Sequence, residues 1–111
     1  GAKTLVFLGG KGGLNPDGSI PETLAEQSKL TWKNIEIALN AAGATRRDVV
    51  EIQIFIVNLG GINPEPVYQD VRDFFPHGHK PVSMVVGVNA LAIPTLKMEI
   101  NVKAVIPKAR R

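Results

Sequence analysis

The sequence has 111 residues, of which 44% are hydrophobic and 21% charged, with no cysteine and a net charge of +3 at pH 7. This length predicts one domain over residues 1–111, and the composition is typical of a soluble globular protein. Because no apolar run approaches the roughly 18–20 residues that span a bilayer, and no signal peptide or disulfide is encoded, we expect a cytoplasmic protein without a membrane partner. The chain begins Gly-Ala rather than with methionine, which leaves room for an upstream segment.

The distribution of cations does not favour nucleic-acid binding. Lys103, Lys108, Arg110 and Arg111 gather near the end of the chain, and we interpret them as a solvated tail. A surface that follows the phosphates of a single strand needs aromatic platforms between its charges, whereas this sequence has one Trp and one Tyr. We therefore expect no nucleic-acid partner.

The first part of the chain predicts a β-hairpin followed by a helix. Thr4 to Leu8 is a strand candidate, and the turn signal Asn15-Pro16-Asp17-Gly18 follows it. From Pro21 to Ala42 helix-forming residues dominate, and Gly43 supplies a C-cap. The inward positions at helical spacing are Leu24, Thr31, Ile35, Ala38, Leu39 and Ala42.

Three further strands and a second helix are predicted after it. Val49 to Val57 alternates as a strand, with Val50, Ile52, Ile54 and Ile56 on one face and Glu51, Gln53 and Phe55 on the other. A short helix from Val67 to Phe75 ends at Pro76. Pro81 to Val88 reads as a strand, and Lys97 to Ala104 alternates strictly between polar and apolar residues, which predicts a last strand whose polar face is wet or carries a site.

This order, ββ-α-β-α-ββ, predicts an α+β fold with a mixed β-sheet and two helices packed on one face. The other face of the sheet must then meet water or a partner. Because Val, Phe and Met residues are available for that face, we favour burial between subunits.

The glycines around Lys11 raise the question of a nucleotide-binding loop. A Walker loop needs a lysine followed by Ser or Thr, but Lys11 is followed by Gly12. The dinucleotide fingerprint started at Gly10 needs a third glycine where the chain has Asn15. Both patterns fail, so we interpret these glycines as allowing a close backbone approach and hairpin geometry.

The remaining candidates for chemistry are two histidines and one acid. His77 and His79 form an H-x-H pair, but no cysteine or third histidine completes a tetrahedral site, and we expect no metal. No elbow motif supports serine–histidine catalysis. Glu99 is flanked by apolar residues on a strand, where a carboxylate at a subunit cleft can orient or activate water. The pattern alone leaves open that Glu99 simply faces solvent.

Four segments together resemble the RidA family, also called YjgF or L-PSP: "LVFLGGKGGLNPDG", "EQSKLTWKNIEIALNAAGATRRDVV", "VYQDVRDFF" and "HKPVSMVVGVNAL…KMEINVKA". They cover nearly the whole chain in order. The resemblance implies a chorismate-mutase-like fold, assembled as a homotrimer whose sheets form a central barrel, with three sites in clefts between subunits. It also implies hydrolysis of reactive enamines and imines to a keto acid and ammonia, without a metal or cofactor.

The resemblance also suggests site residues. In active members an arginine in a P-x-R-[ST] motif grips the substrate carboxylate in a bidentate pair, and an acid on the last strand holds the attacking water. Glu99 falls on that acid and is the candidate catalytic residue, whereas Ser83 falls on the arginine, so the usual clamp is absent. An upstream stretch that normally adds a tyrosine is not in this sequence. The candidate substrate-binding residues are Ser83, Gly9, Lys11, Val82 and Met84, of which Gly9 and Lys11 stand at the serine and glutamine of the usual S-G-Q segment.

Loss of the arginine bears directly on substrate binding. Two charged hydrogen bonds, worth roughly 1.5–3 kcal/mol each, correspond to a loss of carboxylate affinity on the order of 10²–10⁴-fold. Our hypothesis for a replacement is a point cation from Lys11 or Lys80. Three functions stay open: an imine or enamine hydrolase, a non-catalytic trimer that binds a small metabolite or regulates a partner, and, ranked last, the RNA cleavage or translational inhibition attached to relatives.

Overall fold

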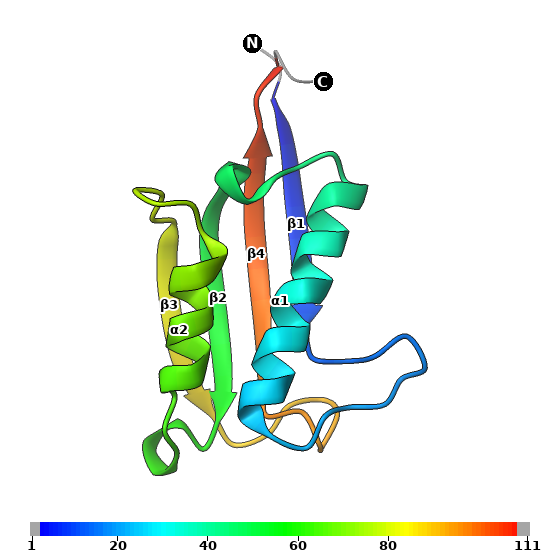
Figure 1. Ribbon diagram of the computed structural model, residues 1–111, viewed down its shortest axis with the longest axis vertical. Helices are drawn as coiled ribbons and strands as arrows, with labels where there is room; N and C mark the ends of the chain where they lie inside the picture. The colour runs from blue at the N-terminus through cyan, green and yellow to red at the C-terminus, as the bar shows by residue number, and fades with distance from the viewer. Residues whose placement is uncertain (1–2, 109–111) are drawn as a thin grey trace.

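The computed structural model describes residues 3–108, which form a four-stranded sheet with two α-helices on one of its faces (Figure 1). The α+β class and the position of both helices, predicted from the sequence, are therefore confirmed. In chain order the elements are β1 (Thr4–Lys11), α1 (Leu24–Ala41), the 3-10 turn η1 (Arg46–Asp48), β2 (Val49–Val57), the 3-10 turn η2 (Leu59–Gly61), α2 (Glu65–Phe74), β3 (Val82–Val88) and β4 (Met98–Ile106).

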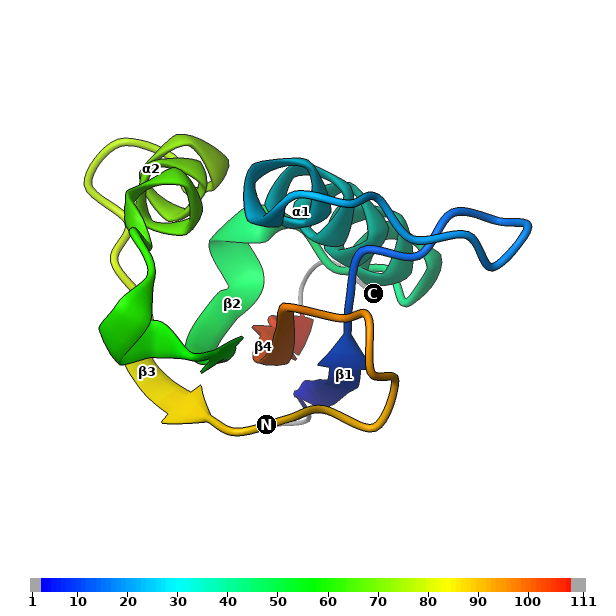
Figure 2. The ribbon, with the colours of Figure 1, turned by 90° about the horizontal axis from the view of Figure 1, so that it is seen from below.

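The sheet is mixed, with strand order β1-β4-β2-β3. β4 lies in the middle and runs antiparallel to both β1 and β2, whereas β2 and β3 are parallel and are joined through α2. Figure 2 shows α1 and α2 in one layer above the sheet, and no helix of the described chain on its other side. We call that other side the open face.

Helix α1 is positioned by its caps and by one buried stripe. The Thr23 hydroxyl accepts a hydrogen bond from the Glu26 backbone N–H (3.1 Å), which is a typical N-cap, so the helix begins later than predicted. Gly43 follows the helix with a φ of +82°, as expected for a glycine after the last turn. Ala42, predicted to face inward, is exposed because it lies at the cap. The buried residues of α1 are Gln27, Ser28, Thr31, Trp32, Ile35 and Leu39.

The predicted N-terminal hairpin is wrong. A turn does form, with the Gly18 N–H donating to the Asn15 carbonyl oxygen (2.9 Å), but the segment after it does not join the sheet. β1 pairs instead with β4, at the far end of the sequence. The loop after β1 is held against α1 by Asn34, whose side-chain NH₂ donates to the carbonyl oxygens of Gly12 (3.0 Å) and Leu14 (2.9 Å).

Strand β2 has the predicted bounds, but its first buried residue differs. Ile52, Ile54 and Ile56 are buried as predicted, whereas Val50 is 45% exposed. The register with β4 shifts between Val49 and Glu51, and such a bulge moves the alternation by one residue. Val49 therefore takes the buried position that was predicted for Val50.

The last strand supplies the centre of the core. Met98, Ile100, Val102 and Ala104 are buried, as the strict alternation predicted. Lys103, interpreted as part of a tail, lies within β4 and forms an ion pair with Glu51 (3.0 Å); Arg110 and Arg111 lie outside the described residues. None of the helices found between residues 3 and 108 combines the length and the apolar character needed to cross a membrane.

Candidate functional site

Polar side chains occupy the middle of the open face, where β4 and β2 lie side by side. The Lys103 ammonium pairs with the Glu51 carboxylate on the neighbouring strand. One step further along, the Asn101 side-chain NH₂ donates to Gln53 Oε1 (3.3 Å), and the Gly10 backbone N–H donates to Asn101 Oδ1 (2.7 Å). These contacts fix the orientations of Asn101 and Gln53, which lie next to the pair formed by Glu99 and Phe55. The sequence placed both on polar strand faces but could not pair them, because strand partners were unknown.

Glu99 lies two residues before Asn101 on β4, opposite Phe55 on β2. Its side chain is half-buried, and within residues 3–108 its carboxylate has no hydrogen bond or ion pair. A Cβ added at Gly10 would lie 3.8 Å from Glu99 Oε2, so the β1 backbone runs directly beside this carboxylate. Because an ionised carboxylate has only acceptor sites, Glu99 is available to accept a proton or a hydrogen bond from water or a ligand.

Apolar side chains flank this polar centre and are exposed. Phe7 on β1 is 66% exposed, and Val82 on the opposite edge of the sheet is 68% exposed. The register places them in one row with Lys103 and Glu51 between them. Leu5 and Met84 add to the same face. Two exposed apolar pairs, Leu5 with Phe7 on β1 and Val82 with Met84 on β3, therefore border the polar centre and indicate an interaction surface rather than a wet face.

Ser83 lies on the other side of the sheet. It pairs with Ile52, which is buried beneath the helices, so its side chain does not share the open face with its neighbours Val82 and Met84. The Ser83 hydroxyl donates to the Pro81 carbonyl oxygen (3.1 Å). It lines a pocket of about 460 Å³ between the end of α2 and the start of β3.

The two lysines proposed as replacement cations occupy different places. Lys80 lines the same pocket as Ser83. Lys11, at the end of β1, lines a separate groove of about 480 Å³ between α1 and the loop that Asn34 holds. Gly9 is exposed on β1, and a Cβ there would meet nothing within 4 Å. Within one chain Lys80 and Ser83 therefore line the same pocket, whereas Ser83 and Glu99 lie on opposite faces of the sheet.

The histidines do not form a metal centre in the part of the chain that the structure describes. His79 Nε2 donates to the Val49 carbonyl oxygen (2.8 Å), which occupies one nitrogen of its ring. No group of three His, Asp or Glu side chains within residues 3–108 could hold an ion.

The fold is the chorismate-mutase-like α+β arrangement, and the comparisons place the chain within one family of that fold. Residues 1–106 match the family described as endoribonuclease L-PSP. A RutC family protein from Aquifex aeolicus is 30% identical over 102 residues, which cover 90% of this chain and 79% of that protein. The chain therefore belongs to the L-PSP family, to which the Rid and YjgF proteins also belong, and the resemblance seen in the sequence is confirmed.

Solved structures agree with this assignment. YyfB of the conserved Rid protein family from Yersinia pestis superposes with a TM-score of 0.84 at 27% identity, covering 90% of this chain and 77% of that one. The structure of E. coli TdcF with bound serine superposes with a TM-score of 0.81 at 27% identity, covering 93% of this chain and 81% of that one. Both matches span nearly all of the chain.

Proposed function

We propose that this protein hydrolyses small reactive imines, and enamines after they tautomerise to imines, with Glu99 as the catalytic carboxylate. Water adds to the carbon of the C=N bond while Glu99 accepts one of its protons. The resulting amino alcohol takes up a proton on nitrogen, the C–N bond breaks, and the carbonyl forms. The products are a keto acid and ammonia, and water is the only other reactant.

The observation that carries this proposal is the state of the Glu99 carboxylate. It is half-buried, has no partner among the described residues, and lies beside the Gly10 backbone on a residue that pairs with Phe55 of β2. A carboxylate used only for stability would more often be paired, as Glu51 is with Lys103. The bound serine in the TdcF structure supports a small amino-acid-like ligand for a protein of this shape.

The proposed site lies between copies of the chain in a homotrimer. The open face has exposed apolar side chains on both edge strands, among them Phe7 and Val82, and association of copies through that face would remove these side chains from water. The same association would turn the half-exposed Glu99 into a residue of an enclosed cleft, where a charged group acts on the substrate with less competition from solvent. The trimer expected from the family resemblance is the closed assembly that we propose.

The test is the hydrolysis of an imine generated in the assay by a pyridoxal-phosphate enzyme, measured as the loss over time of free imine that semicarbazide can still trap. We expect the protein to accelerate this loss, and Glu99→Gln to lower kcat by about 10²–10⁴-fold, because that is the usual contribution of a general base. Glu22→Gln, an equal change at an exposed loop residue, should leave the rate unchanged. No acceleration by the wild-type protein, or an active Glu99→Gln variant, would contradict the proposal.

The second candidate is a trimer that binds a small metabolite without turning it over. The observation in its favour is Ser83, which stands where the family resemblance implies an arginine and whose hydroxyl is already used by Pro81. Under this alternative Glu99→Gln changes ligand affinity alone. Calorimetry with serine or pyruvate, run beside the imine assay, separates the two candidates.

A further inference from the structure

A pocket of about 410 Å³ lies between α1 and α2, in the layer of helices that covers one face of the sheet. Figure 2 shows this layer on the side opposite the open face, so the sheet separates the pocket from Glu99. Among the described residues it shares no lining side chain with the pocket beside Ser83. A concave, partly apolar surface with a few polar groups is the usual form of a small-molecule site, and the proposed hydrolysis does not use this one.

Two buried polar groups line this pocket without a hydrogen-bond partner. Trp32 on α1 is 4% exposed and Asp70 on α2 is 7% exposed. Within residues 3–108 neither the Trp32 indole Nε1–H nor Asp70 Oδ2 takes part in a hydrogen bond. The Ser28 hydroxyl, one turn before Trp32, is also unpartnered but does not line the pocket. Because an unpartnered buried polar group is costly, Trp32 and Asp70 indicate a ligand that satisfies both.

The chemistry of these two groups limits what the ligand carries. An indole N–H can only donate a hydrogen bond, and an ionised carboxylate oxygen can only accept one. A ligand that satisfies both therefore needs an acceptor and a donor close together. A hydroxyl group offers both on one oxygen, and a carboxamide offers them on neighbouring atoms.

The charges around the pocket favour an uncharged ligand. Three cations and three acids line it, so they carry no net charge. The Lys29 ammonium lies 2.6 Å from Asp70 Oδ1, and it would repel a second cation placed at Asp70 Oδ2. An anion that accepted from the Trp32 N–H would instead be repelled by the Asp70 carboxylate, which lines the same pocket.

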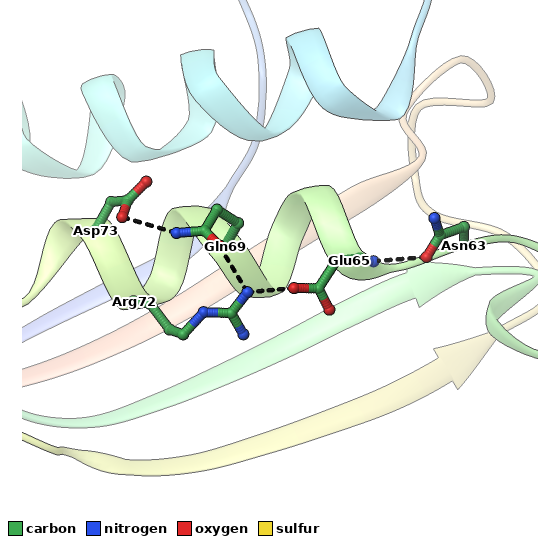
Figure 3. Close-up of polar contacts among 5 residues, drawn as sticks. All are labelled: Asn63, Glu65, Gln69, Arg72 and Asp73. Carbon is green, nitrogen blue, oxygen red and sulfur yellow. Dashed lines mark hydrogen bonds and ion pairs between the residues drawn. The ribbon is translucent and has the colours of Figure 1, made fainter.

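Other charged side chains of the pocket already have partners. Arg46 forms an ion pair with Glu36 and donates from Nη1 to the Phe74 carbonyl oxygen (2.9 Å). Asp73 Oδ1 accepts a hydrogen bond from the Gln69 side-chain NH₂ (2.9 Å), as Figure 3 shows on α2. These contacts are made within the protein, which leaves Trp32 and Asp70 as the buried groups open to a ligand.

Aromatic rings give the pocket an apolar floor. The ring centroids of Trp32 and Phe74 are 4.6 Å apart, with a tilt of 38° between the rings, and both residues are buried. The exposed side chains of Lys29 and Ile37 line the same pocket and form its rim. A ligand reaches the buried groups when these exposed side chains rotate, which is common on binding. A ring-shaped ligand suits this floor because aromatic rings pack well against one another.

We propose that this pocket binds a small uncharged ring compound through a hydroxyl or carboxamide group. That group accepts a hydrogen bond from Trp32 Nε1–H and donates one to Asp70 Oδ2, while the ring packs on Phe74 and Ile37. The inference is independent of imine hydrolysis, because it uses no residue of the open face.

Trp32 is the one tryptophan of the chain, so an NMR spectrum of ¹⁵N-labelled protein has a single indole N–H signal, and it reports on this pocket. Phenol and benzamide are the probes. We expect both to move this signal downfield until it saturates, because the N–H gains an acceptor. Toluene has the ring alone and should bind about three- to tenfold more weakly than phenol. Benzoate and benzylamine, which are charged, should also bind more weakly.

Trp32→Phe keeps an aromatic ring and removes the N–H. Measured by calorimetry, its preference for phenol over toluene should fall about three- to tenfold, because one hydrogen bond to phenol is lost. The ratio of the two affinities cancels any change in packing that both ligands experience. Asp73→Asn, at a lining residue whose carboxylate takes no part in the proposed contacts, should keep the wild-type preference.

Several results would overturn the inference. Phenol and benzamide could leave the indole signal unmoved, or toluene could bind as tightly as phenol to the wild-type protein. Trp32→Phe could retain the full preference for phenol, and benzoate or benzylamine could move the indole signal at lower concentration than phenol does. A water molecule that stays in contact with the indole N–H at saturating phenol would assign Trp32 and Asp70 to a buried structural water instead.

Discussion

Ser83 and Glu99 lie on opposite faces of the same sheet. Ser83 pairs with Ile52 and Glu99 pairs with Phe55, on the two sides of β2. At about 3.3 Å per residue along a strand and about 4.8 Å between strands, their Cα atoms are about 14 Å apart, with the sheet between their side chains. A three-carbon acid cannot contact both residues within one chain, so a site that uses both needs two copies.

The first prediction concerns assembly. Sedimentation or light scattering should give three times the mass of one chain. Phe7→Asp replaces an exposed apolar side chain of the open face by a charge and should shift the protein towards single chains, because a charge buried in the interface would be costly. Ile37→Asp, at a residue of α1 that is 57% exposed against 66% for Phe7, should leave the mass unchanged. Single chains for the wild-type protein would contradict the prediction.

The second prediction concerns Gln27, a fully buried residue of α1. Its NH₂ donates to the carbonyl oxygens of Pro21 (2.9 Å) and Thr95 (3.0 Å), and its Oε1 accepts from the Lys97 N–H (2.8 Å). Gln27→Leu leaves these backbone groups without partners and should lower the free energy of unfolding by about 2–4 kcal/mol.

Urea denaturation measures the effect of Gln27→Leu. Gln69→Leu, on the exposed side of α2, is the control and should cost less than about 1 kcal/mol. Similar losses in the two variants would show that the buried hydrogen bonds between α1 and the chain entering β4 contribute little.

The third prediction concerns two glycines near the start of the chain. A Cβ at Gly13 would lie 2.8 Å from the Gln27 backbone oxygen, whereas a Cβ at Gly9 would meet nothing within 4 Å. Gly13→Ala should therefore force the loop away from α1 and clearly lower the melting temperature. The new Cβ is fixed to the loop backbone and meets the backbone of α1, so neither side can move aside by a side-chain rotation. Gly9→Ala should have little effect in the same thermal melt, and equal melting temperatures would contradict the packing described.

The fourth prediction concerns pH and the Lys29–Asp70 ion pair, in which Nζ lies 2.6 Å from Oδ1. The pKa of Lys29 is raised above its usual 10.5, first by the hydrogen bond to Asp70 and then by attraction to the same charge. A raised pKa means that the stabilisation is fully present below pH 10.5 and is lost as the pH rises through the raised value. Stability should therefore fall above pH 10.5.

Two variants isolate this pair from the other lysines. Lys33→Met keeps the ion pair and should lose stability at high pH as the wild type does, whereas Lys29→Met should show a smaller loss and a lower stability at neutral pH. Urea midpoints at about pH 9 and about pH 11.5 make the comparison. Parallel pH profiles for the two variants would show that the pair does not stabilise the fold.

Elements whose hydrophobic residues recur at a regular spacing could be predicted from the sequence. The strict alternation of β4 placed Met98 and Ile100 in the core and Glu99 on the other face, and the helical spacing of α1 placed Ile35 and Leu39 inward. These features depend on residues close together in the chain. The family resemblance added the chorismate-mutase-like arrangement to the α+β class that the order of elements predicted.

What the sequence could not supply depends on distant partners. The turn at Asn15–Gly18 is a local signal and forms, but pairing of β1 with β4 is decided by segments about 100 residues apart. The exposure of Val50 follows from a bulge in the β2–β4 register. For the same reason the pairing of Asn101 with Gln53, and the meeting of Lys80 with Ser83 in one pocket, became visible only in the folded chain.

The most direct test of the two-chain site mixes two defective variants. Glu99→Gln removes the carboxylate, and Ser83→Trp fills the pocket beside β3; each should be inactive in imine hydrolysis when pure. In trimers formed by equal co-expression, about a quarter of the clefts receive an intact Glu99 from one chain and an intact Ser83 from the next. We predict the return of about a quarter of wild-type activity. Mixed trimers that stay inactive would contradict it.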